Sequence, residues 1–92
     1  MPGGTTFLVE RYIPRLRPAD IDLLASRLTA ATTELRAEGR DVHWLRSYAL
    51  PDDETCLCIF TASARTDVEE ANRLAGSAYE RIVETLTVER AR

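Results

Sequence analysis

The chain has 92 residues, a length that fits one domain spanning residues 1–92 and lies near the lower limit for a hydrophobic core without a cross-link or a partner. Its 12 basic and 15 acidic residues give a net charge of -3 and are scattered along the sequence, which argues against binding to nucleic acid or to an acidic membrane surface. The apolar run Phe7–Val9 is too short for a signal peptide or a membrane span, so we expect a cytoplasmic protein.

The first half of the chain predicts a strand followed by a helix. Residues Phe7–Ile13 form an apolar strand pattern that ends at Pro14, because proline removes a ladder donor. The helix begins at Pro18, which suits the first helical position, and Gly39 supplies its end. Its apolar residues follow the spacing of one helical face: Ile21, Leu24, Leu28, Ala31 and Leu35.

The second half predicts a hairpin, a helix and a last strand. The runs Asp41–Leu50 and Thr55–Ala62 are rich in strand-forming residues and flank the turn sequence PDDE. Thr66 and Glu69 have the spacing of a capping box that opens a second helix, and Gly76 closes it. Weak alternation over Ile82–Val88 predicts the fourth strand.

This order, β-α-β-β-α-β, is that of the α+β ferredoxin-like fold, a four-stranded antiparallel sheet with two helices on one face. The other face stays open in a monomer. An uncovered apolar sheet face is too large a patch for a small soluble monomer, so we expect a homodimer that packs through this face.

Two charges interrupt the first strand. Alternation places Arg11 with Phe7 and Val9 on the helix-covered face, where we expect its guanidinium to reach water past the strand end. Glu10 lies on the open face with Tyr12, and a carboxylate there needs a partner, a metal or a wet cavity. We favour an ion pair with an arginine, or a solvated rim, over a functional role for Glu10.

The second strand decides what else lines the open face. In one register Trp44, Arg46 and Tyr48 join Glu10 and Tyr12 in a ligand pocket. In the register shifted by one residue, the side chains of His43, Leu45 and Ser47 take their place. The hairpin turn contains no glycine to choose between the two.

Few residues offer chemistry. Cys56 and Cys58 project from one face of their strand and could chelate a soft metal, although such a pair is more often two small buried apolar residues. His43 is the single histidine and could be a ligand or a proton carrier. The sequence has no Ser-His-Asp order, no phosphate loop and no paired histidines at helical spacing.

Several segments together resemble one family: FLVERYIP, VHWLRSYAL, CLCIF, EEANRLAG and RIVETLTV. This family of small bacterial ferredoxin-like proteins was long catalogued as a domain of unknown function and is now often labelled nickel-binding, after a characterised actinobacterial member. The resemblance covers Phe7 to Val88 and implies a homodimer that binds metal through imidazole and carboxylate groups.

The chain departs from that family at three positions. Members often carry histidine where Tyr12 and Asn72 stand and glutamate where Thr61 stands. Because nickel favours imidazole nitrogen, we predict weak nickel binding or none, and an open face that holds an organic ligand or nothing. The remaining metal-ligand candidates are Glu10, His43, Cys58 and Glu84.

Three functions remain open at the level of the sequence. We favour a non-catalytic ligand- or metal-binding homodimer that resembles the nickel-binding family and has a degraded metal site. The alternative is a cofactor-free dimeric α/β-barrel enzyme, of oxygenase or isomerase type, that uses the pocket around Glu10, a hypothesis based on analogy between folds. The third is an interaction module whose open face only makes the dimer.

Overall fold

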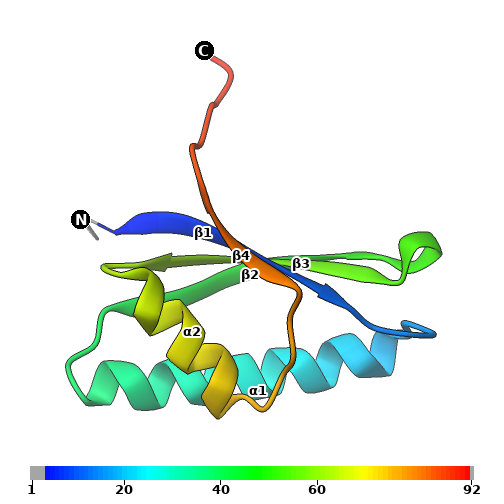
Figure 1. Cartoon of the computed structure of the whole chain (residues 1–92), viewed down its shortest axis with the longest axis horizontal. Coiled ribbons are helices and arrows are strands. Elements are labelled where there is room, and N and C mark those ends of the chain that lie inside the picture. Colours follow the sequence, from blue (N-terminus) through cyan, green and yellow to red (C-terminus); the bar gives the residue numbers. More distant parts are fainter. Residues whose placement is uncertain (1–3, 92) are drawn as a thin grey trace.

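The computed structural model describes residues 4–91 and confirms the ferredoxin-like order of elements. In chain order these are β1 (Thr5–Tyr12), α1 (Pro18–Ala37), β2 (Val42–Leu50), a short 3-10 turn (Pro51–Asp53), β3 (Thr55–Ala62), α2 (Arg65–Leu74) and β4 (Arg81–Thr85). The four strands form one antiparallel sheet in the order β2-β3-β1-β4. Both helices lie on the same side of this sheet (Figure 1), which leaves the opposite side uncovered.

The core lies between the sheet and the two helices. Alternate residues of the central strands point into it, including Phe7 and Val9 from β1 and Phe60 from β3. Leu28 and Leu35 cover them from α1, at the helical spacing that the sequence shows. None of the helices in residues 4–91 is long and apolar enough to cross a membrane.

Each helix ends at a glycine, as the sequence predicts. Gly39 has φ 88 and Gly76 has φ 65, a left-handed conformation that glycine adopts without steric cost. The amide of Arg40 donates to the carbonyl of Leu35, and the amide of Ser77 donates to that of Asn72. These bonds satisfy carbonyls at the helix ends in the Schellman pattern.

The predicted capping box at Thr66 is wrong. Helix α2 begins at Arg65, two residues earlier than a cap at Thr66 would place its start, and its N-cap residue Ala64 has no side chain that could accept a hydrogen bond. Thr66 therefore lies inside the first turn. The guanidinium of Arg65 donates to the carbonyl of Ile82, so a contact with β4 rather than a local cap fixes the start of α2.

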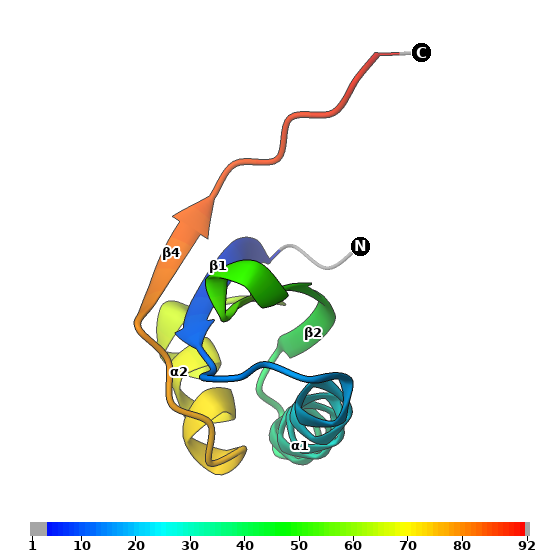
Figure 2. The ribbon, with the colours of Figure 1, turned by 90° about the vertical axis from the view of Figure 1, so that its right-hand side faces the viewer.

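The fourth strand is shorter than predicted. It ends at Thr85 rather than Val88, and its last ladder pair is Thr85 with Thr6, one residue from the start of β1 at Thr5. The segment after Thr85 leaves the sheet and extends away from the body of the molecule (Figure 2). Leu86 and Val88 are 90% and 92% exposed.

Candidate functional site

The uncovered sheet surface is called the open face below, and its centre is apolar. Leu8 on β1 lies opposite Ile59 on β3 and Val83 on β4, and Leu57, two residues before Ile59 on β3, lies opposite Glu10. All four side chains are half-buried in the single chain. The open face therefore carries a row of large aliphatic side chains, from the two central strands and from β4, that no helix covers.

Glu10 lies next to this apolar centre and is paired with Arg81. The two residues are direct cross-strand partners between β1 and β4, and Oε1 of Glu10 accepts a 2.7 Å hydrogen bond from Nε of Arg81. The ion pair that the sequence favours for Glu10 is thus present. Its arginine comes from β4.

Tyr12 occupies the end of the open face, beside the hairpin turn. Its hydroxyl donates a 3.0 Å hydrogen bond to Oε1 of Glu54, and the amide of Arg15 donates a 2.6 Å hydrogen bond to Oε2 of the same carboxylate. The hydrogen bond and the charge of Glu54 raise the pKa of Tyr12. The amide of Arg15 and the hydroxyl of Tyr12 lower the pKa of Glu54. The Tyr12 side chain is therefore held by a local carboxylate.

Neither predicted register of the second strand is right, because β2 contains an irregularity between Trp44 and Arg46. Trp44 pairs with Phe60 and packs against the core, and after the extra residue Leu45 the alternation resumes with Arg46 opposite Ile59. Arg46 and Tyr48 therefore share the open face with Glu10 and Tyr12, as predicted. Trp44 lies on the helix-covered side instead, so it is not part of the predicted pocket.

Trp44 and Ser47, on either side of this β-bulge, form hydrogen bonds on the helix-covered side of the sheet. Nε1 of Trp44 donates a 3.0 Å hydrogen bond to Oγ of Ser47, and Ser47 donates to Sγ of Cys58 at 2.9 Å. Ser47, which the shifted register places on the open face, is thus part of the helix-covered side. His43 lies at the other end of β2, where its Nε2 is 3.0 Å from Oδ1 of Asp41.

The four metal-ligand candidates do not meet within one chain. Glu10 is on the open face, Cys58 is fully buried on the helix-covered face, and His43 is paired with Asp41. Glu84 lies opposite Phe7 on the edge strand β4 and is exposed. Within residues 4–91, no group of three or more histidine, cysteine, aspartate or glutamate side chains could hold a metal ion.

Arg11 is the largest departure from the sequence-based expectation. It does not reach water but is 2% exposed in the core. Its NH2 group donates to Oδ1 of Asn72 at 2.6 Å, and its NH1 group lies 3.2 Å from the carbonyl oxygen of Ala78 and 3.5 Å from that of Ser77. The loop after α2 thus closes over the end of β1 and replaces water as the hydrogen-bond acceptor for the guanidinium.

Two thiols lie beside Arg11. Cys56 is its cross-strand partner on β3, and the sulfur atoms of Cys56 and Cys58 are 3.8 Å apart. Both cysteines are free and fully buried. Hydrogen bonds from Cys56 and Ser47 and the positive charge of Arg11 lower the pKa of Cys58 to about 6. The hydrogen bond to Cys58 and burial raise the pKa of Cys56.

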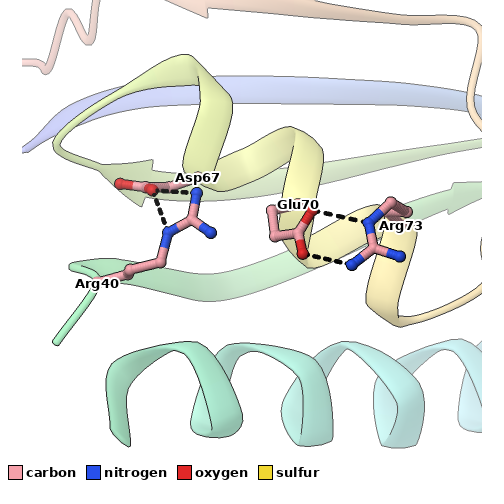
Figure 3. Close-up of polar contacts among 4 residues, drawn as sticks. All are labelled: Arg40, Asp67, Glu70 and Arg73. Atoms are coloured by element: carbon pink, nitrogen blue, oxygen red, sulfur yellow. Dashed lines mark hydrogen bonds and ion pairs between the residues drawn. The ribbon is translucent and has the colours of Figure 1, made fainter. Parts of the chain in front are cut away.

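A surface groove of about 590 Å³ follows α2 and the loop after it. Arg40, Glu70 and Arg73 line it; Arg73 is paired with Glu70, and Arg40 is paired with Asp67 of α2, as Figure 3 shows. The hydrogen bonds from Arg73 lower the pKa of Glu70. Because both guanidinium groups already have carboxylate partners, the groove presents balanced charges rather than a site for one ion.

The positions at which the resemblance points to histidine lie on opposite sides of the sheet. Tyr12 faces outward on the open face, whereas Asn72 is buried under α2 and bonded to Arg11. Thr61, the third such position, lies on the open face between Thr6 and His43 in the strand ladders. Imidazoles at positions 12 and 72 would not meet at one metal within a single chain.

Comparison with known proteins confirms the resemblance. The family model described as "Nickel responsive protein SCO4226-like" matches residues 7–85. The chain belongs to the SCO4226-like family. The crystal structure of SCO4226 from Streptomyces coelicolor A3(2) matches this structure with a TM-score of 0.78, over 91% of this chain and 99% of that chain. The two sequences are 15% identical over the match, so this likeness to an SCO4226-like protein establishes the fold alone. None of the curated proteins compared with the chain matches it significantly.

Proposed function

We propose that this member of the SCO4226-like family is a non-catalytic, cytoplasmic homodimer that pairs through its open face. The observation that carries the proposal is the half-buried aliphatic row on that face, Leu8, Leu57, Ile59 and Val83. Aliphatic side chains on two central strands gain most from a second subunit, because contact removes their remaining surface from water. Two reduced cysteines are consistent with a reducing compartment.

The same proposal holds that nickel binds weakly or not at all. Tyr12 and Asn72 supply no imidazole, and both already have partners, Glu54 and Arg11 respectively. His43 is the single histidine of the chain. A late first-row divalent metal gains most of its affinity from nitrogen and sulfur donors, and one imidazole per chain cannot supply several of them.

Calorimetric titration with nickel tests this part of the proposal. We expect little heat and no stoichiometric binding for the wild-type chain, and no change in the His43→Ala variant. The variant Tyr12→His is the matched gain-of-function control, because it places an imidazole next to the carboxylate of Glu54. Tight wild-type binding that His43→Ala abolishes would contradict the proposal.

The enzyme alternative has less support. The predicted pocket needs Trp44 beside Glu10, and Trp44 packs against the core on the other side of the sheet. Glu10 is engaged by Arg81 at 2.7 Å, so it is not a free base. The non-catalytic homodimer therefore remains the function that the geometry supports best.

A further inference from the structure

Arg11 is a buried positive charge with only neutral hydrogen-bond partners among the described residues. Its guanidinium contacts the amide oxygen of Asn72 and the carbonyl oxygens of Ser77 and Ala78, and its Nε atom has no partner. Arginine stays protonated in proteins, and a buried charge without an opposite charge is strongly unfavourable. A negative charge beside Arg11 would therefore stabilise this part of the core.

The two thiols are the acidic groups next to this charge. Cys56 faces Arg11 directly across the β1–β3 ladder, and Cys58 follows two residues later on the same side of β3. Their sulfur atoms are 3.8 Å apart, and the hydroxyl of Ser47 donates to Cys58. If the two sulfurs share one proton, the pair carries a single negative charge that balances Arg11.

We propose that Cys56 and Cys58 form a buried two-sulfur site for a soft monovalent cation, Cu(I), which takes the place of the proton between the two sulfur atoms. Thiolates are the ligands that Cu(I) prefers. Metal–sulfur bonds are about 2.3 Å in zinc sites, so a cation between the sulfurs fits once they move apart by less than about 1 Å.

Charge balance selects a monovalent ion for this site. Exchange of a proton for Cu(I) leaves the group of Arg11 and two sulfurs neutral, as it is before binding. A divalent ion such as nickel would add a buried positive charge that no described neighbour compensates. The site is thus separate from the nickel question and does not depend on the proposed dimer.

The binding step is an ion exchange without a redox change. Two copper–sulfur bonds form, the S–H bond of Cys56 breaks, and its proton leaves to solvent, while copper keeps its oxidation state. Both sulfurs are fully buried, so entry needs a local opening. Ser47, on the edge strand β2, contacts Cys58, so a local opening of β2 would remove one of the contacts that cover this sulfur.

The test is an anaerobic titration of the reduced full-length protein with Cu(I) in competition with the chelator bicinchoninate, in weak buffer at neutral pH. We expect one copper bound and one proton released per chain. Cys56→Ala and Cys58→Ala should each abolish stoichiometric binding. Arg11→Met should weaken it by about 10–100-fold, as is typical when a group that supports metal ligands is removed.

His43→Ala is the matched control and should bind Cu(I) like the wild type, because His43 is paired with Asp41 away from the two sulfurs. X-ray absorption of copper in the wild-type protein keeps the test independent of whether the cysteine variants fold, and two sulfur ligands are expected. Nitrogen or oxygen ligands, binding that survives in a folded Cys58→Ala variant, or no binding in competition with the chelator would each overturn the proposal.

Discussion

Arg11 and Glu10 are neighbours in sequence, and only one of them behaves as the sequence predicts. Glu10 needs a cationic partner on the open face and finds one directly across the strand pair, in Arg81. Arg11 is buried because the loop after α2 supplies carbonyl oxygens at Ser77 and Ala78. Those acceptors come from residues more than sixty positions away in the sequence. Strand alternation alone could therefore predict on which face of the sheet Arg11 lies, but not which groups accept its hydrogen bonds.

Removing the side-chain acceptor of Arg11 should destabilise the protein. Asn72→Ala takes away the 2.6 Å partner of the Arg11 NH2 group and leaves a buried charged donor unsatisfied. We expect the free energy of unfolding to fall by about 1.5–3 kcal/mol in chemical denaturation. Arg73→Ala, which breaks an exposed ion pair on the same helix, should change it little. Equal effects of the two substitutions would contradict this role for Asn72.

The Cys58 thiol should make stability depend on pH. Its pKa in the folded protein is about 6, below its ordinary value of 9.0, so the unfolded state binds more protons between these limits. The contribution of this thiol to the free energy of unfolding is therefore complete above pH 9 and is lost as the pH falls to 6. We expect the melting temperature of the wild type to rise more across this range than that of Cys58→Ser. Parallel curves for the two proteins would show that Cys58 is not ionised in the folded state.

At the scale of elements, the two faces of a strand could be predicted where buried and less buried side chains alternate regularly, but not where a bulge interrupts the alternation. The pattern of β3 identifies both of its faces, since Cys56, Cys58 and Phe60 are buried and alternate with half-buried neighbours without a break. The bulge in β2 has no glycine or other local marker, yet it turns Trp44 and Ser47 to the helix-covered side. One inserted residue changes the phase of a strand, which is why neither of the two sequence-based registers matches β2.

The helix ends were predicted from glycine, and Gly39 provides a test of the physical reason. Its φ of 88 is disfavoured for residues with a Cβ atom, although no atom lies within 4 Å of the place where a Cβ would be. Gly39→Ala should lower the free energy of unfolding by about 1–2 kcal/mol through backbone strain. Gly39→Asn should cost less, because asparagine tolerates the left-handed conformation. A larger loss for asparagine than for alanine would point to crowding instead.

At the scale of the whole molecule, the two helices cover one side of the sheet and leave the open face without a cover (Figure 1). The family and the fold are established by the comparisons, whereas pairing of two chains is the proposal that gives the aliphatic row a role. In that arrangement Glu10 and Arg81 meet the partner as an already neutral pair, which removes the cost of burying an isolated carboxylate.

Light scattering on two matched variants tests this proposal most directly. Ile59→Asp places a charge in the aliphatic row, and Leu23→Asp places the same charge at an exposed position of α1. At micromolar concentration we predict twice the 10.3 kDa mass of one chain for the wild type and for Leu23→Asp. Ile59→Asp should have the mass of a single chain and an unchanged circular dichroism spectrum. A monomeric wild type, or a dimer that survives Ile59→Asp, would contradict pairing through the open face.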